Sequence, residues 1–313
     1  MLTRVGNRLG NVVDDLGLEA HRVELTGYCY RMLGSGFEAE DAVQETMLRA
    51  WRAHHDPARG SVRTWLYAIA TNICLDMLRS AQRRARSVDL GPASEPGPDI
   101  GAPLPESAFV RPMPDFRVLD PADVATRRES VRLAFVAALQ HLPARQRAVL
   151  ILRDVLHWHA DEVAALLDTT ATAVHSALRR ARATIRAPAP TDPLDDEHRA
   201  LLDRYVDAFE RYDVATLTAL LHEDATMDMP PFAWWLRGRE DIGAALAAGD
   251  GTCFGHRLVP TTVNGVGAFG QYDAEGKPFA LVTVETSGGL IVAMTTYLDL
   301  ADRFEFFGLP PRR

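Results

Sequence analysis

Two stretches in the first half of the chain repeat apolar residues at the spacing of an α-helix. Residues three or four apart share one face of a helix. The apolar positions are Val43, Met47 and Trp51 in residues 38–51, and Trp65, Ile69, Ile73 and Met77 in residues 63–85. The pattern predicts two amphipathic helices whose apolar stripes, Trp65 included, pack into a core.

Polar residues form a second face on each predicted helix. The first helix carries Asp41, Gln44, Glu45 and Leu48, and the second carries Asn72, Asp76, Arg79 and Arg83. A face of this kind is either a contact surface or simply a solvated side of the helix. Asp76 and Arg79 lie three residues apart, so they also fit an ion pair on the helix surface.

A third pattern, in residues 142–186, predicts a helix-turn-helix. Residues 160–167 predict a short helix with Val163 and Leu167 facing inward, and Thr170 suits the N-cap of the next helix. The second helix of such a motif enters the major groove of DNA. Its outward positions are Ala171, Thr172, His175, Ser176, Arg179 and Arg182. A generic helical hairpin with a solvated basic edge is the alternative.

Proline marks the boundaries between these patterns. Residues 87–125 contain eight prolines, a density that a helix or a central strand does not tolerate. Residues 187–194 (APAPTDPL) form a shorter linker of the same kind. We therefore expect domains at 1–86, 126–187 and 195–313, with a proline-rich linker over 87–125.

The last domain changes period partway along. Residues 198–213 predict an amphipathic helix, whereas residues 279–300 are rich in β-branched residues on both sides of Gly288-Gly289. Paired glycines between two such runs indicate a β-hairpin. The chain is thus predicted to be multidomain, with two all-α domains followed by an α+β domain that has a curved sheet.

Charge is unevenly spread along the chain, although its formal net value is −8. Residues 49–86 hold eight arginines against two acids, whereas residues 192–250 hold fourteen acids against five arginines. Such asymmetry points to nucleic acid, because neutralising phosphates requires a basic surface. The three cysteines and the remaining metal-ligating residues lack zinc-site spacing, and no glycine-rich phosphate loop is present. We expect no metal, no cofactor, no membrane segment and a cytoplasmic location.

Three ordered segments resemble the extracytoplasmic-function (ECF) sigma factors of the sigma-70 family, the promoter-recognition subunits of bacterial RNA polymerase. AEDAVQETMLRAW resembles their core-binding helix and RTWLYAIATNICLDMLR their −10 helix. Residues 142–182 resemble their −35 domain. The resemblance implies that residues 1–86 are region 2 and that residues 126–187 are region 4.

The resemblance also assigns roles to the polar faces. Asp41, Gln44, Glu45 and Leu48 would dock on the clamp of the largest subunit of core RNA polymerase. Promoter DNA would meet Arg63, Asn72, Asp76, Arg79 and Arg83 at the −10 element, and Thr170, Thr172, His175, Ser176, Arg179 and Arg182 at the −35 element. The loop at residues 54–63 would hold a flipped base of the −10 strand.

Residues 195–313 resemble a SnoaL-like domain, a cone-shaped α+β fold with a curved sheet around a pocket. We expect this fused domain to regulate the sigma factor in cis, and a small ligand in its pocket is a further candidate partner. The candidate pocket residues are Asp228, Trp234, Trp235, His256, Tyr272 and Tyr297. No arrangement of catalytic residues is evident, so we expect no enzymatic activity.

Two other classes of protein remain compatible with parts of the sequence. One is a SnoaL-like isomerase or cyclase whose N-terminal helices direct it, and the other is a one-component, ligand-responsive repressor. Neither class requires both a −10 helix and a core-binding helix, whereas a sigma factor requires both.

Overall fold

The structure is a computed structural model of the chain, and it describes residues 17–53, 55–56, 60–79, 84–119, 128–185, 195–249 and 251–313. The chain divides into two compact units. Residues 1–84 and 110–187 form a helical unit, and residues 85–109 and 188–313 form a C-terminal unit. The predicted linker over 87–125 is therefore shared between the two units.

The first half of the helical unit contains the short helix η1 (Leu18–His21) and the helices α2 (Arg22–Leu33), α3 (Gly36–Arg52) and α4 (Val62–Met77). Serine caps begin two of them: Ser35 Oγ accepts from Glu38 N, and Ser61 Oγ accepts from Thr64 N at 3.1 Å. Such caps satisfy backbone donors that have no partner within the helix. Tyr28 of α2 and Tyr67 of α4 pack together in the core with tilted rings, whose centroids are 5.1 Å apart.

Two details of the first helices differ from the predicted stripes. Val43 is buried as predicted, but Trp51 is 36% exposed, because α3 buries Ala39, Ala42, Thr46 and Ala50 beside Val43 instead. Trp65 is half-buried and packs against His55, with ring centroids 5.2 Å apart. In addition, α4 ends at Met77 rather than near 85. Small residues, not the largest apolar ones, therefore line the closest helix contacts.

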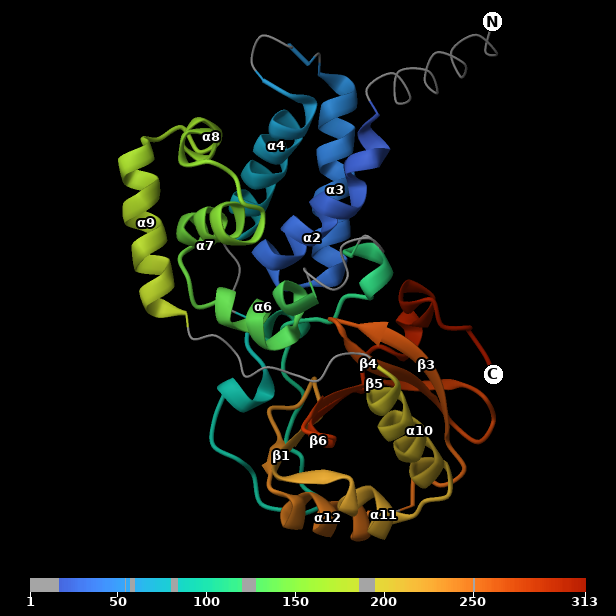
Figure 1. The fold of residues 1–313 in the computed structure, drawn as a ribbon. Coiled ribbons are helices and arrows are strands. Elements are labelled where there is room, and N and C mark those ends of the chain that lie inside the picture. The colour runs from blue at the N-terminus through green and yellow to red at the C-terminus, as the bar shows by residue number, and fades with distance from the viewer. Residues whose placement is uncertain are drawn as a thin grey trace, which may run out of the picture. The chain divides into compact units, whose positions relative to one another are not determined.

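The second half of the helical unit contains η5 (Asp115–Arg117), η6 (Arg128–Val131), α6 (Leu133–Leu139), α7 (Ala144–Leu150), the single π-helical turn η7 (Ile151–Val155), α8 (Ala160–Leu166) and α9 (Ala171–Thr184). Helices α8 and α9 form the predicted helix-turn-helix (Figure 1). Asp168 has a left-handed φ of 50° in the turn, and Thr170 Oγ1 accepts from Ala173 N at 3.2 Å. The predicted N-cap is thus confirmed.

The C-terminal unit is built on one six-stranded sheet with the order β2-β1-β6-β5-β4-β3. Its strands are β1 (Leu221–Asp228), β2 (Trp235–Arg237), β3 (Arg257–Val263), β4 (Val266–Tyr272), β5 (Pro278–Ser287) and β6 (Leu290–Tyr297). Strands β1 and β6 are parallel, and the other neighbours are antiparallel. Gly288 and Gly289, both with positive φ, form the predicted hairpin turn between β5 and β6.

Helices cover one face of this sheet, which curves around them (Figure 1). They are α10 (Asp196–Glu210), α11 (Val214–Ala219) and α12 (Arg239–Ala247). Their buried residues join Met227, Val282 and Met294 of the strands in one apolar core. The short helix η8 (Ala301–Phe307) lies against the opposite face, where Phe304 contacts Tyr272 with ring centroids 5.1 Å apart.

Residues 85–109, which include η3 (Ser87–Asp89) and η4 (Glu106–Ala108), follow the β2 edge of the sheet. Ser94 N donates to Trp235 O, and Leu104 N donates to Pro231 O, both at 2.8 Å. The indole Nε1 of Trp235 donates in turn to Gly91 O at 3.1 Å. This segment, which we call the strap, occupies part of a strand edge that would otherwise be unpaired.

Candidate nucleic-acid interface and C-terminal cavity

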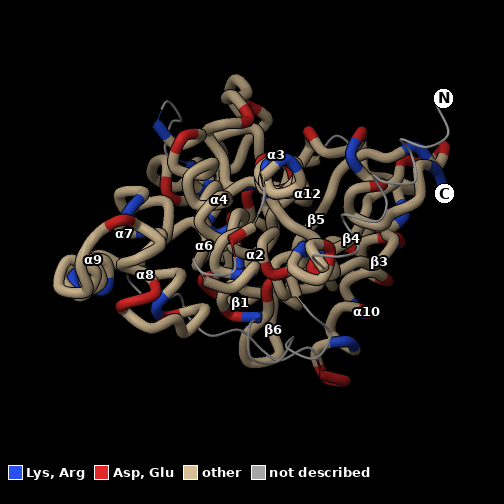
Figure 2. The backbone as a smooth tube through the Cα atoms, turned by 90° about the horizontal axis from the view of Figure 1, so that it is seen from above, with Lys and Arg blue, Asp and Glu red and all other residues tan. Residues whose placement is uncertain are grey.

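Helix α9 presents a basic outer face above a buried inner one. Val174, Leu178 and Ala181 are buried against the rest of the helical unit. Thr172, His175, Arg179 and Arg182 are exposed, and Figure 2 marks basic residues along this helix. Thr170 is exposed as the cap, and Ser176 is half-buried. The structure thus brings the predicted −35 residues onto one helix.

The arginines of α9 differ in their partners. Arg182 makes a two-pronged ion pair with Asp154, with N···O distances of 2.9 and 2.7 Å. Arg180 donates to Ser176 Oγ at 3.1 Å. Arg179 has no ion pair within the described ranges. Its guanidinium faces solvent and is accessible to an anionic partner.

The predicted −10 residues of α4 divide into two groups. Asn72, Asp76 and Arg79 are exposed on one face, and Arg79 pairs with Asp76 at 3.3 Å, as their spacing allows. Arg83 lies outside the described residues, as does part of the 54–63 loop. The exposed group is therefore open to solvent on the half of α4 nearer its C-terminal end.

Arg63, near the start of α4, is half-buried and contacts other side chains of the helical unit instead. It donates to Glu24 of α2 at 2.8 Å. Its guanidinium also lies over the rings of Tyr67 and Trp158, at 5.1 and 5.2 Å from their centroids. Trp158 precedes α8, so an arginine of α4 contacts a residue of the helix-turn-helix half.

Trp158 was not expected to have a role, yet it anchors this contact. It is 5% exposed and packs against Tyr67 with its ring tilted, and the ring centroids are 4.9 Å apart. Buried aromatic pairs of this kind stabilise the contact by more than their buried area alone provides. A tryptophan in a loop between two helices, in the stretch HWH, is the only sequence signal for it.

The predicted polymerase-docking face lies along α3. Asp41 and Gln44 are exposed, and Leu48 is 36% exposed. Glu45 is half-buried and pairs with Arg49 at 2.6 Å. The face therefore combines acidic groups with one exposed apolar residue, which is the composition of a protein contact with a basic, partly apolar surface.

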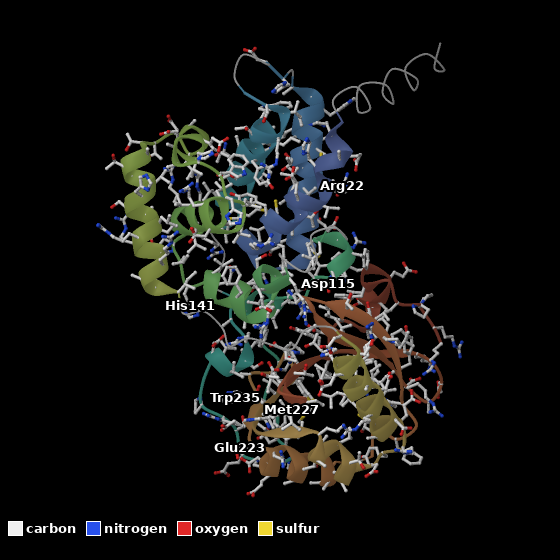
Figure 3. All side chains as sticks on the ribbon, in the orientation of Figure 1. Arg22, Asp115, His141, Glu223, Met227 and Trp235 are labelled. Carbon is white, nitrogen blue, oxygen red and sulfur yellow. The ribbon has the colours of Figure 1, made fainter. Side chains whose placement is uncertain are left out.

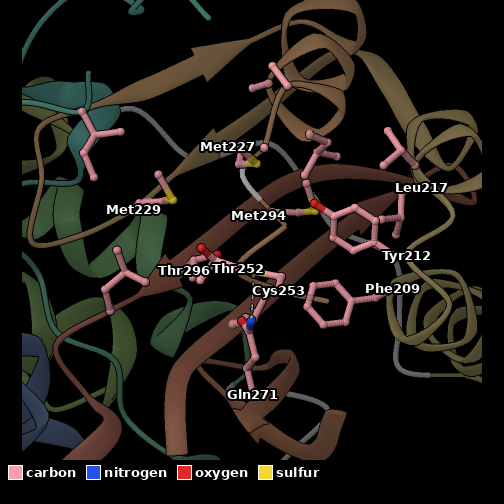
Figure 4. A pocket seen from close by; sticks show the side chains of 18 of the residues that line it. Phe209, Tyr212, Leu217, Met227, Met229, Thr252, Cys253, Gln271, Met294 and Thr296 are labelled. Atoms are coloured by element: carbon pink, nitrogen blue, oxygen red, sulfur yellow. Dashed lines mark hydrogen bonds between the residues drawn. The ribbon is translucent and has the colours of Figure 1, made fainter. Parts of the chain in front are cut away.

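A cavity of about 590 Å³ opens on the helix-covered face of the C-terminal sheet. Met227, Met229 and Met294 line it together with aromatic residues of α10 and the following turn (Figure 4). Trp234 is the one predicted pocket residue among its lining residues. The other five predicted residues, Asp228, Trp235, His256, Tyr272 and Tyr297, do not line it.

Strand register explains this outcome. Directly paired residues place their side chains on the same face of a sheet, and successive residues alternate. Met227 pairs with Met294 on the cavity face, so Asp228, which pairs with Trp235 and Thr295, lies on the other. Met227 and Trp235 are labelled in Figure 3. His256 lies behind the wall, where its Nδ1 accepts from the lining residue Gln271 at 2.8 Å.

Asp228 is buried beneath the strap. Thr295 Oγ1 donates to its carboxylate at 2.6 Å, and the Ser87 hydroxyl is a second partner. Burial raises the pKa of Asp228 from 3.8 to about 6, although these hydrogen bonds and the charge of Arg86 act in the opposite direction. The carboxyl group is thus a structural, titratable contact between strand β1 and the strap.

Other kinds of site find no support within the described ranges. No group of three His, Cys, Asp or Glu side chains is arranged there to hold a metal ion. None of the helices described there has both the length and the apolar character needed to cross a bilayer.

Comparison with known families agrees with the order of these elements. Residues 18–84 match Sigma-70 region 2, and residues 132–185 match Sigma-70, region 4. Residues 202–303 match the SnoaL-like domain. The two sigma-70 regions in this order define a promoter-recognition protein.

Relatives extend the match over nearly the whole chain. The ECF RNA polymerase sigma factor SigG of Mycobacterium tuberculosis is 41% identical, over 93% of this chain and 82% of its own length. SigJ of the same species is 32% identical over 66% of this chain and 62% of its own length. The crystal structure of SigJ shares the fold, with a TM-score of 0.59, 24% identity, and coverage of 96% of this chain and all of that one.

The chain therefore belongs to the ECF RNA polymerase sigma factors that carry a C-terminal SnoaL-like domain. It is a sigma factor, which directs promoter-specific initiation of transcription. Of the three classes that the sequence left open, the relatives favour this one.

Proposed function

We propose that three exposed helix faces divide the work of this sigma factor. The α3 face with Asp41, Gln44, Glu45 and Leu48 docks on the polymerase clamp. The exposed residues of α4, joined by Arg63 and Arg83, bind the −10 element, and the outer face of α9 binds the −35 element. The observation that carries this proposal is the exposure of polar groups on all three helices beside fully buried inner faces.

The assignment of Arg63 to the −10 element depends on a change in its contacts. Its guanidinium contacts Glu24, Tyr67 and Trp158 in the structure, so a rearrangement that releases these contacts would leave it fully available to DNA. Binding of polymerase or promoter favours such a rearrangement if either partner binds the open arrangement more tightly. We therefore assign the described arrangement to the free protein.

The docking face is tested by run-off transcription with purified core polymerase. Replacing both Asp41 and Glu45 by arginine reverses charge across the contact and should abolish core binding and initiation. Asp203 and Asp207 provide the matched control, because they also lie four residues apart on an exposed helix face, that of α10. Their replacement by arginine should leave core binding intact. Equal core binding by both double variants would refute the assignment.

We further propose that the C-terminal unit regulates the sigma factor in cis through the strap. The strap leaves the helical unit after Arg84 and returns to it at Val110, and its backbone is bonded to residues beside the sheet edge in between. A strap that is bound to the C-terminal unit restricts the conformations that the helical unit can adopt. In this proposal the domains remain 1–86, 126–187 and 195–313. The linker between the first two covers 87–125, and the strap is its regulatory part.

The regulatory role is tested by loosening the strap. Trp235→Phe removes the hydrogen bond to Gly91 O but retains an aromatic ring, and one such bond is worth roughly 0.5–1.5 kcal/mol. We expect initiation to rise roughly two- to tenfold at unchanged core binding. The control is Arg237→Gln on the same strand as Trp235, which removes an exposed ion pair with Asp224 of β1. Identical initiation by both variants and the unmodified protein would contradict regulation through the strap.

A further inference from the structure

The cavity of the C-terminal unit has a wall that is almost free of charge. No Asp, Glu, His, Lys or Arg is among its lining residues within the described part of the chain. Its volume of about 590 Å³ lies in the range of sites for small organic ligands. A charged ligand would lose its hydration there without gaining an ion pair, so the wall favours a neutral one.

Methionine makes this wall adaptable as well as apolar. Met227 of β1, Met229 just after that strand and Met294 of the adjacent strand β6 converge on the same space (Figure 4). Unbranched thioether side chains adjust to ligands of different outline and contact aromatic rings favourably. The cavity therefore suits a ring-containing or branched hydrocarbon skeleton more than one rigidly defined shape.

One wall residue also carries an unsatisfied donor. Trp234 is 6% exposed, and among the described residues its buried indole Nε1 has no hydrogen-bond partner. A buried N–H without an acceptor costs free energy. A ligand that brings a carbonyl or ether oxygen to this wall would recover that cost.

The strap completes the cavity from outside the domain's own sequence. Gly97, Pro98 and Ile100 line it, and Ile100 packs against the apolar core of the unit. Backbone hydrogen bonds from Ser94 and Leu104 hold the strap on either side of this contact. A ligand in the cavity would thus contact the strap and the sheet at the same time.

We propose that this cavity binds a neutral, mostly apolar small molecule with a hydrogen-bond acceptor, and that the bound molecule fastens the strap to the sheet through Ile100. The proposal deepens the regulation in cis proposed above. Ligand binding adds free energy to the strapped arrangement, because the loosened one lacks part of the wall.

The binding site is tested with the full chain and the neutral dye Nile red, which is apolar and has a carbonyl oxygen. We expect saturable binding of one dye per chain, seen as an increase in its fluorescence. The anionic dye anilinonaphthalene sulfonate, also aromatic, should bind at least about tenfold more weakly. Absence of saturable Nile red binding, or equal affinity for both dyes, would overturn the proposed ligand class.

Coupling to the strap is tested with two variants in that segment. Ile100→Ala shortens a lining side chain and should weaken Nile red binding roughly tenfold. Leu104→Ala shortens an exposed side chain that does not line the cavity and should leave the affinity unchanged. Equal affinities for the two variants would remove the strap from the site.

Hydrogen exchange gives a second measurement that does not depend on either variant. Saturating Nile red should slow exchange at the amides of Ser94 and Leu104, which donate to Trp235 O and Pro231 O, and leave the β3 amides unchanged. Unchanged exchange at both strap amides would overturn the fastening. Since neither assay involves transcription, dye binding with unaltered initiation would remove the regulatory role and leave the site in place.

Discussion

Helix α9 and strand β1 place their charged groups in opposite surroundings. The guanidinium groups of Arg179 and Arg182 extend into solvent, where salt screens them. The carboxyl group of Asp228 is buried under the strap, beyond the reach of screening, and its charge depends on pH. Salt concentration should therefore change the affinity of the DNA contact, whereas pH should change the stability of the C-terminal unit.

The largest expected effect is the pH response of Asp228. Its folded pKa of about 6 lies above the ordinary 3.8, so the folded protein binds this proton more tightly than the unfolded chain does. Stability from this group therefore rises as pH falls from above 6 towards 4, by on the order of 3 kcal/mol. Asp228→Asn is neutral throughout and should lose this rise, and it should be more stable than the unmodified protein above pH 6.

Urea unfolding of the full chain at pH 5 and pH 8 measures the difference. Asp224→Asn is the control, because Asp224 lies on the same strand but is exposed and paired with Arg237. Its pH dependence should match that of the unmodified protein. If Asp228→Asn also matches, the buried carboxyl does not titrate as described, and the contrast with α9 fails.

The next effect in size concerns Arg179. Arg179→Ala should weaken promoter binding of the holoenzyme by roughly 1–3 kcal/mol if the guanidinium contacts a base, and by less if it contacts phosphate alone. A phosphate contact would also make the salt dependence of binding less steep. Fluorescence anisotropy at several salt concentrations measures both quantities. Unchanged affinity together with an unchanged salt slope would show that α9 is not the reading helix.

The smallest effect is expected at Arg182. This arginine leaves its ion pair with Asp154 to bind DNA, so part of any contact it makes there replaces one it already has. Arg182→Ala should therefore cost less than about 1 kcal/mol of promoter affinity, the usual range for exposed pairs. Asp154→Ala frees the arginine and should strengthen binding slightly. A loss at Arg182 as large as that at Arg179 would remove the distinction between paired and free arginines.

Sequence patterns located helices more reliably than cavities. In the helix-turn-helix, the cap Thr170 and the buried Val174 and Leu178 are confirmed, because one short segment contains both the turn and the faces. In α3 the predicted stripe is right at Val43 and wrong at Trp51, because the helix buries small alanines beside Val43 instead of the large tryptophan. Helical period specifies a face only when the neighbouring helix is known.

The cavity was harder to predict for a different reason. Asp228 and Tyr297 are predicted pocket residues because of their polar groups. Strand alternation, however, places them on the face opposite Met227 and Met294. Which face encloses space depends on how the sheet curves, and no local pattern reports that. Ile100 comes from a proline-rich stretch far from the domain in sequence, so its place in the wall required the tertiary structure.

The path of the strap means that the two units are linked in three places along the chain, not one. The backbone passes between them at residues 84–85, 109–110 and 187–188. Cleavage at a protease site inserted into residues 187–194 would leave two links uncut, so residues 195–313 would stay bound to residues 85–109 only through contacts without a covalent bond. Deleting residues 195–313 instead strips residues 85–109 of their partner and leaves Ile100 exposed to water. The cleaved protein and the truncated protein are therefore different molecules, and only the first separates loss of the tether from loss of the domain.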